Sequence, residues 1–408
     1  MALTQEAKRI SALFELSVHD LNRGVQEFLN QMNSGLKKDE TSSSQIPSYV
    51  TRDSDGAEKD LYLAAYLGGA DYRVCSVNMY GDMTFKLAFT KVTISMGLML
   101  AKTAEELCAF LATQIEDSLE LHHPEHYTTI VRKRQTPNDP SIFEDKVFQL
   151  GFTFSFLVQQ LGFDIPDSVE RDLCVLLQQE IDKRVLLVRV AALVNDTVSR
   201  LMARSYTASG KTRKLLGVTF DTGTNGRISR NSPISRNLSR EKVNKSTTNP
   251  GTHMYEKHVS GMLLDELVRL AVLHMMQSPD VLLFGGLDTI ANNRTSNTAI
   301  SGKSPIQTVW GLDTALLSMA AAGNTTNLSV HALSVDDTRT FKEIANSVVH
   351  RAARLSSISL AAIPIHRGAL NHGTNDEPVD IGVDSSVIEH YPFYLDMVYE
   401  GLRAILGI

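Results

Sequence analysis

Leu193-Val194-Asn195-Asp196-Thr197 and Phe220-Asp221-Thr222-Gly223-Thr224-Asn225-Gly226 are the two short stretches around which the chain is organised. Each follows an apolar run of the kind that forms a buried strand. The first ends with a carboxylate that can take a proton from a hydroxyl. The second is a turn whose backbone N–H groups can face phosphate oxygens, so the pair predicts phosphoryl-transfer chemistry. The alternative is structural: Asp196 caps a turn, and Gly223 and Gly226 form only a hairpin.

Length and composition set the outer bounds. A chain of 408 residues with 43% hydrophobic residues predicts two domains or one large bilobal body. The formal net charge of −6 gives no sign of direct nucleic-acid binding. No secretory signal and no run of about 18 apolar residues typical of a membrane span is found. Three widely spaced cysteines form no metal-binding pattern, which favours a reducing, cytoplasmic compartment: Cys75, Cys108 and Cys174.

Five segments in order along the chain resemble the hexokinase family. They are LGFTFSF at Leu150–Phe156, LVNDTVSRLMARSY at Leu193–Tyr206, YEKHVSGMLLDELVRL at Tyr255–Leu270, RAARLSSISLAAI at Arg351–Ile363, and DSSV at Asp384–Val387. Their common order along the chain is far more specific than any single motif.

The resemblance implies an α/β, two-lobed sugar kinase fold of the actin-like, ribonuclease H-like type, with a mixed five-stranded sheet in each lobe. It divides the chain into an N-terminal helix and linker at residues 1–45, a small domain at 46–196 and a large domain at 197–408. The boundary is approximate, and the C-terminal helix is the element that could return to the small lobe. Apolar residues at helical spacing between Val18 and Met32 predict the N-terminal helix itself.

The resemblance also implies roles on the sugar side. Asp196, at the end of the predicted strand Val185–Val194, matches the catalytic base, and Asn195 matches a sugar contact. Asn225 and Glu256 match further sugar contacts. Gln159 stands where the family has a sugar-binding serine.

Two family segments that hold the sugar have no counterpart in this chain. Immediately after Gln159-Gln160 the chain continues at Leu161-Gly162, so the segment with the family's Thr-Lys pair is missing. The basic run Arg227–Lys245 lacks the family's Asn-x-Glu-x-Gly segment and its glutamate. The simplest interpretation of this run is a surface loop, and the alternatives are a phosphorylated loop or a nuclear-import patch.

The first phosphate loop of the family resembles the turn between two predicted strands, Tyr62–Gly69 and Tyr72–Met79. Gly68, Gly69 and Arg73 match the family pattern. Three neighbours do not match: Tyr66 replaces an acid that helps to hold magnesium, Ala70 replaces a threonine and Asp71 replaces an asparagine.

The residues at the other nucleotide-binding segments also match the family pattern only in part. Thr222 and Gly223 match the second phosphate turn, but Asp221 replaces a glycine there. A carboxylate at this place adds both a side chain and a negative charge beside the phosphates. Ser385 and Ser386 match the family's adenosine-side turn.

Local signals predict several further elements. Thr103-Ala104-Glu105-Glu106 is a capping box and predicts a helix with an apolar face, whereas Leu121–Pro140 predicts a solvated loop whose histidines lack metal-site partners. Helices are also predicted at four other places: Asp167–Arg184, Leu263–Met276, Phe341–Ile365 and Tyr391–Leu406.

A retained base with reduced sugar and phosphate contacts predicts a catalytically impaired hexokinase-like protein, and the resemblance to non-catalytic members of the family implies a role as a regulator. Non-catalytic relatives of this kind in filamentous fungi are linked to carbon-source response and to control of secreted proteases. Its expected partners are weakly bound hexose and ATP and an unidentified regulatory protein. The alternatives are an active hexose phosphotransferase that uses Mg-ATP, with Asp196 as base, and a product without a role.

Overall fold

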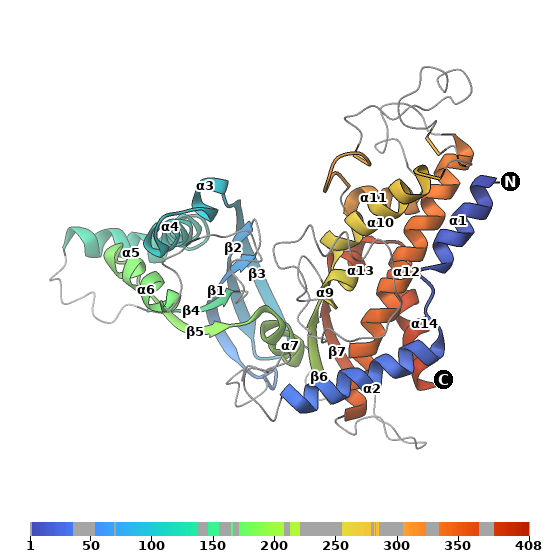
Figure 1. Ribbon diagram of the computed structural model, residues 1–408. Coiled ribbons are helices and arrows are strands. Elements are labelled where there is room, and N and C mark those ends of the chain that lie inside the picture. The colour runs from blue at the N-terminus through green and yellow to red at the C-terminus, as the bar shows by residue number, and fades with distance from the viewer. Residues whose placement is uncertain are drawn as a thin grey trace. The chain divides into compact units, whose positions relative to one another are not determined.

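The computed structural model describes residues 2–35, 54–68, 71–136, 146–154, 165, 171–207, 213–220, 255–278, 281, 283–284, 305–312, 314–323, 334–366 and 379–407. The chain divides into two compact units (Figure 1). The sheet unit is Pro47–Gly217, and the helical unit combines Met1–Ile46 with Val218–Ile408. The domain boundaries drawn from the sequence at 46 and 197 remain a proposal.

The sheet unit is built on a mixed five-stranded sheet of order β3-β2-β1-β4-β5. β1 pairs antiparallel with β2, and β2 with β3, whereas β4 is parallel to both β1 and β5. This confirms the mixed sheet and the two strands predicted on either side of the first glycine turn. The strands are β1 (Lys59–Gly68), β2 (Asp71–Tyr80), β3 (Phe85–Thr93), β4 (Phe148–Phe154) and β5 (Val188–Val194).

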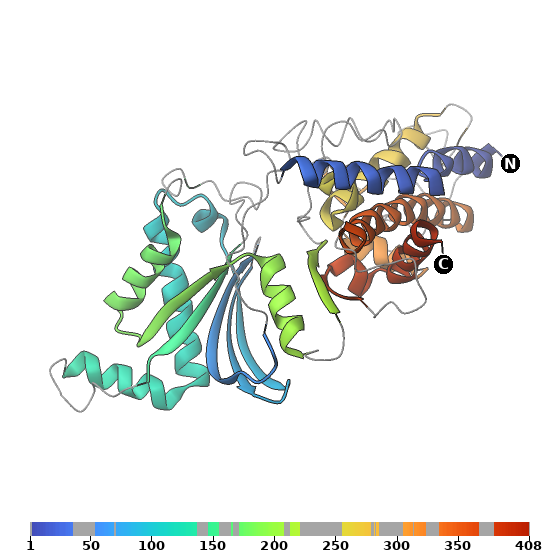
Figure 2. The same cartoon turned by 90° about the horizontal axis from the view of Figure 1, so that it is seen from below.

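Strand alternation places one face of this sheet in the core. Leu63, Ala65 and Leu67 of β1 are each at most 3% exposed, and they pack in one apolar cluster with α4 (Ala104–His122) and α6 (Leu173–Lys183). Figure 2 shows these two helices on the same side of the sheet. Burying a large aliphatic side chain contributes about 1.5–3 kcal/mol, so this face holds the unit together. Thr103 is confirmed as the N-cap of α4, because its hydroxyl accepts a hydrogen bond from the Glu106 backbone N–H, which is one half of the predicted capping box.

The loop predicted at residues 121–140 is wrong for most of its length. Pro124–Gln135 form helix α5. Pro124 begins the helix, where its missing N–H removes no internal bond, and the basic residues Arg132–Arg134 suit the C-terminal end of the helix dipole. Only Ile130 is fully buried, so the stretch lacks the apolar periodicity that would have revealed the helix.

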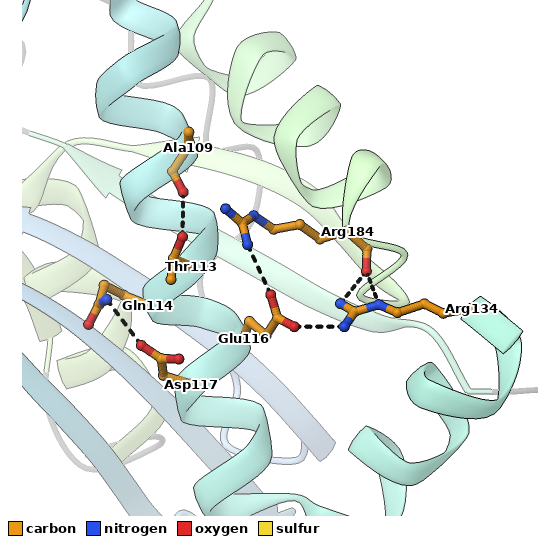
Figure 3. Close-up of polar contacts among 7 residues, drawn as sticks. All are labelled: Ala109, Thr113, Gln114, Glu116, Asp117, Arg134 and Arg184. Atoms are coloured by element: carbon orange, nitrogen blue, oxygen red, sulfur yellow. Dashed lines mark hydrogen bonds and ion pairs between the residues drawn. The ribbon is translucent and has the colours of Figure 1, made fainter.

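A charged cluster joins three helical segments of the sheet unit (Figure 3). The carboxylate of Glu116 on α4 pairs with Arg134 of α5 at 2.8 Å and with Arg184, just after α6, at 3.1 Å. The Arg134 Nε also donates to the Arg184 carbonyl oxygen at 2.8 Å. With the Glu116 side chain only 15% exposed, this network holds the ends of α5 and α6 against α4.

The helical unit is organised around one long helix, α12 (Val335–His366), most of whose length is buried. α1 (Ala2–Ala12), α2 (Val18–Gly35), α10 (Gly261–Met276) and α14 (Tyr394–Leu406) pack against it, and the last three confirm predicted helices. A Cβ atom on Gly401 of α14 would lie 2.4 Å from the Ser357 hydroxyl, so glycine allows these helices to approach closely.

The remaining elements of the described chain are short. The family resemblance predicts five strands in the large lobe, and the described residues outside the five-stranded sheet contain one strand pair, β6-β7. The bounds are α3 (Met96–Met99), α7 (Asp196–Thr207), β6 (Arg213–Thr219), α9 (Glu256–Val259), α11 (Thr314–Ala321), β7 (Val379–Asp384) and α13 (Ser386–His390).

Candidate functional site

The carboxyl ends of β1, β4 and β5 lie at one edge of the sheet because these strands are parallel. Tyr66 pairs with Thr153, and Thr153 pairs with Val194. Two strand spacings therefore separate β1 from β5 at this level, roughly 10 Å. Gly68 and Asp196 each follow two residues later in their segments, so the fold brings the first glycine turn and the predicted base to the same edge.

Asp196 begins helix α7 and is only 6% exposed. Its Oδ1 accepts a hydrogen bond from the Thr197 backbone N–H at 2.8 Å, and the Asn195 Oδ1 accepts from the same N–H at 3.0 Å. The Asn195 carbonyl oxygen accepts from the Ser199 N–H, closing the first helical turn. A carboxylate here is stabilised by the positive end of the helix dipole, so Asp196 has a structural role whether or not it acts as a base.

A glycine on β6 allows helix α7 to pack closely against that strand. A Cβ atom on Gly217 of β6 would lie 2.4 Å from the Thr197 carbonyl oxygen and 2.9 Å from the Leu201 N. The backbones of α7 and β6 therefore touch, which only a residue without a side chain permits. β6 leads directly to the predicted second phosphate turn, which begins at Asp221.

The far end of α7 is also held. The Tyr206 hydroxyl donates to the Thr84 carbonyl oxygen at 2.8 Å and accepts from the Gly81 N–H at 3.3 Å, both in the turn between β2 and β3. Both ends of the helix that begins with Asp196 are thus anchored within the sheet unit.

The end of β1 is occupied by an aromatic ring. A Cβ atom on Gly68 would lie 2.6 Å from the Tyr66 Cε1 and 2.7 Å from its hydroxyl oxygen, so the tyrosine ring lies against the glycine. Arg73 pairs with Tyr66 across β1 and β2, and its guanidinium carbon is 6.0 Å from the ring centroid. Tyr66 therefore fills the space beside the glycine as well as replacing an acid.

The negative charge of Asp71 has a partner that sequence analysis missed. Lys91 of β3 forms an ion pair with the Asp71 carboxylate at 2.6 Å, and the Thr93 hydroxyl lies 3.5 Å from it. A cation therefore partly offsets the charge expected to repel phosphates. The signal that could have found it is the alternation along residues 85–93, which indicates a third strand next to β2.

The helical unit carries the other predicted residues. The buried Ser385 caps α13, with its hydroxyl accepting from the Ile388 N–H at 3.1 Å, and the backbone of Ser386 begins that helix. Glu256 begins α9, which is anchored because the adjacent Tyr255 hydroxyl donates to the Leu355 carbonyl oxygen at 3.0 Å. Other predicted site groups lie outside the described residues: Gly69, Gln159, Thr222, Gly223, Asn225, and the side chains of Glu256 and Ser386.

Two features of the described residues bear on ligands and membranes. No cluster of three or more His, Cys, Asp and Glu side chains in the described ranges is placed to hold a metal ion. Among the helices that the structure describes, none is both long and apolar enough to cross a membrane.

Sequence comparison decides the family. The hexokinase sequence profiles match residues 6–206 and 218–408. The chain belongs to the hexokinase family. A glucokinase of Aspergillus niger is 38% identical over 464 aligned positions, which cover 99% of this chain and 91% of that protein. Because the alignment is longer than the 408-residue chain, that glucokinase contains segments without a counterpart here.

Other members of the hexokinase family agree. Hexokinase-2 of Schizosaccharomyces pombe is 26% identical, with 99% of this chain and 91% of that protein covered. The structure of the Schistosoma mansoni hexokinase complexed with glucose superposes with a TM-score of 0.77 at 25% identity, covering 99% of this chain and 93% of that one. A second hexokinase crystal structure, at 21% identity and a TM-score of 0.71, shows the same fold. The predicted two-lobed sugar kinase fold is confirmed.

Proposed function

We propose that this hexokinase-family protein has kept the base of the hexokinase reaction but phosphorylates hexoses weakly or not at all. Its role on this proposal is regulatory, in the response to carbon source or in the control of secreted proteases. The observation that carries the proposal is the Tyr66 ring packed against Gly68. An aromatic ring stands where the family places a magnesium-supporting acid beside its first phosphate loop.

The reaction of the family transfers a phosphoryl group from ATP to a hexose hydroxyl and gives hexose 6-phosphate and ADP. Asp196 is the residue that would take the hydroxyl proton, and its place at a strand end suits that role. The end of β1, however, does not fit Mg-ATP. A tyrosine offers no carboxylate for the metal, and its ring fills space that phosphate oxygens would need to reach the backbone.

The sugar side supports the same proposal. Asn195, Asp196, Asn225 and Glu256 are the retained contacts, while the Thr-Lys segment and one glutamate are missing from the sequence. Each lost hydrogen bond to a buried sugar hydroxyl is worth roughly 1–3 kcal/mol. Weak hexose binding is the expected result. A base cannot compensate for a substrate that is poorly positioned.

The regulatory part of the proposal rests on the family resemblance. A protein that keeps the two-lobed fold and loses turnover can still present its surface to a partner. We place it in the cytoplasm, with nuclear entry through Arg227–Lys245 as the alternative. The regulatory partner is a protein that the sequence does not identify.

Calorimetry and a coupled assay test the proposal together. The purified full chain is titrated with glucose, with Mg-ATP, and with both, and its turnover is measured on several hexoses beside Asp196→Ala. We expect weak or undetectable binding and no turnover above that of Asp196→Ala. Micromolar glucose affinity, or robust turnover that Asp196→Ala abolishes, would contradict it.

Robust turnover that Asp196→Ala abolishes would instead support the second candidate function, an active ATP-dependent hexose phosphotransferase. The observation that favours it is the intact geometry around Asp196, which is buried, held at a helix N-terminus and placed at the same sheet edge as Gly68.

A further inference from the structure

β3 forms an edge of the five-stranded sheet and carries large apolar side chains that are unusually exposed. Phe85 is 46% exposed, Leu87 47% and Phe89 56%. They alternate along the strand and therefore share one face of the sheet. A long edge strand with exposed apolar residues is a template for pairing with another strand.

The hydrogen-bond phase of the β2–β3 hairpin shows which backbone groups face outward. The Tyr80 N–H donates to the Thr84 carbonyl oxygen at 3.1 Å, so Tyr80 and Thr84 are a hydrogen-bonded pair. Because such pairs alternate in an antiparallel ladder, the odd-numbered residues of β3 point their N–H and C=O groups away from β2. Phe85, Leu87 and Phe89 therefore combine outward backbone groups with exposed side chains.

The opposite edge of the same sheet is covered. The Gln178 side chain of α6 accepts from the Val190 N–H at 2.7 Å and donates to the Val188 carbonyl oxygen at 3.1 Å. A side-chain amide thus takes the place of a neighbouring strand along β5. Within the described part of the chain, no side chain does the same for Phe85, Leu87 and Phe89 on β3.

The sequence of β3 is nearly symmetric about Leu87. It reads Phe85-Lys86-Leu87-Ala88-Phe89, with an aromatic ring two residues away on either side. In an antiparallel pair of two such strands centred on Leu87, Leu87 faces its own copy and Phe85 faces Phe89. Lys86 then faces Ala88, so no two lysines are opposed.

Other registers are less favourable. Moving the two-fold axis by one or two residues toward the C-terminus places Lys91 opposite Phe85 or Leu87, respectively. Moving the axis by one or two residues toward the N-terminus places Met83 opposite Phe89 or Leu87, respectively. Met83 lies beyond the strand, in the hairpin turn. Only the register centred on Leu87 pairs Phe85, Leu87 and Phe89 exclusively with one another and keeps all the pairs within the strand.

We propose that β3 pairs antiparallel with β3 of a second copy of this chain, about a two-fold axis at Leu87. The interface is isologous, because the same strand serves both subunits. Phe85, Leu87 and Phe89 of each copy would form hydrogen-bonded pairs and a continuous apolar row across both sheets.

Charge variants at the axis test this register. The wild-type full chain should show a concentration-dependent dimer in sedimentation velocity. L87E and L87K should each weaken dimerisation by at least about tenfold, because the new charge faces an identical charge. An equimolar mixture of L87E and L87K should recover a heterodimer. The matched control is Leu121, a leucine of the same unit that is 65% exposed, and neither L121E nor L121K should change the dimer.

The double variant F85E/F89K gives a second, independent measurement. In the proposed register its new acid faces the new base of the partner, so F85E/F89K should dimerise while F85E alone should not. A wild-type chain that stays monomeric at high micromolar concentration would overturn the proposal, whatever other partner β3 accepts. So would a dimer that L87E leaves unchanged, or a mixture of L87E and L87K that remains monomeric.

Discussion

The carboxyl ends of β1 and β5 lie at the same edge of one sheet, yet they have diverged to different degrees. At β5, the family's Asn-Asp pair is present, buried and held by local hydrogen bonds. At β1, the family's acid is a tyrosine whose ring lies against the turn glycine. The difference follows from structural cost. Asn195 caps α7 and Asp196 occupies its first turn, so losing them destabilises the fold, whereas Tyr66 lies at a partly exposed strand end where other side chains can be accommodated.

This comparison limits what a retained base says about activity. A carboxylate in the first turn of α7, at the positive end of the helix dipole, has a structural reason to persist even where turnover has been lost. The β1 end, where the family's acid is replaced, is therefore the more informative indicator of function. The following experiments test the roles of the β5 end and the β1 end separately, beginning with the largest expected effect.

Gly217→Ala tests whether backbone contact fixes the β5 end. We expect the free energy of unfolding to fall by about 3 kcal/mol, because the new Cβ meets the backbone of α7 and one of the two elements must move. Chemical denaturation measures it. The matched control is Gly151→Ala, also within a strand, where the nearest atom would be 4.0 Å away. Similar losses in the two variants would mean that α7 is not held by this contact.

Tyr66→Ala tests the β1 end. Removing the ring opens the space beside Gly68, and we expect Mg-ATP affinity in calorimetry to rise about tenfold, or about 1.4 kcal/mol. Tyr66→Phe keeps the ring and should leave the affinity unchanged. Tyr62→Ala, on the same face of the same strand, is the control for losing a tyrosine elsewhere. Unchanged nucleotide binding in Tyr66→Ala would show that the tyrosine ring is not what weakens Mg-ATP binding. The next variant to test is then Tyr66→Asp combined with Asp221→Gly.

Asp196→Asn and Asp196→Ala separate the structural role of this residue from its role as a base. Asparagine keeps an acceptor for the Thr197 N–H, so Asp196→Asn should retain its stability, whereas Asp196→Ala should lose about 1 kcal/mol. Any residual turnover should vanish in both. Thermal unfolding and the coupled assay give the two readings. Equal stability of the wild type and Asp196→Ala would show that the cap is not the reason for retention.

The smallest expected effect is a loss of stability of the folded protein at acidic pH, and it sets the pH range in which the other variants should be compared. Burial, together with neighbouring His126 and His122, lowers the pKa of His123. A lowered folded-state pKa stabilises the fold above the unfolded value of about 6.5, and this contribution is lost as the pH falls through the folded pKa. We expect a loss below about 1 kcal/mol because the imidazole is partly exposed. His123→Phe should flatten the stability profile between about pH 7 and pH 5, and an identical slope in both proteins would exclude His123 as its source.

Much of the sheet unit could be predicted from local patterns. The strands around Gly68, the capping box at Thr103 and the carboxylate at the end of β5 follow from alternation, cap residues and turn glycines that lie close together in sequence. α5 was missed because its composition is polar and its packing rests on few buried side chains. β3 was missed although its residues alternate, since the pattern of an exposed edge strand does not distinguish buried from solvent-facing positions.

By itself the sequence determined the family, the positions of Asp196 and Gly68 at strand ends, and the absence of an acid at Tyr66. These features depend on the identity and spacing of neighbouring residues. The tertiary structure alone decided that the Tyr66 ring lies against Gly68, that Lys91 pairs with Asp71, and that one sheet edge is covered by Gln178 while the β3 edge is not. These contacts arise from side-chain directions and strand register, which join residues distant in sequence and are fixed only when the sheet has formed.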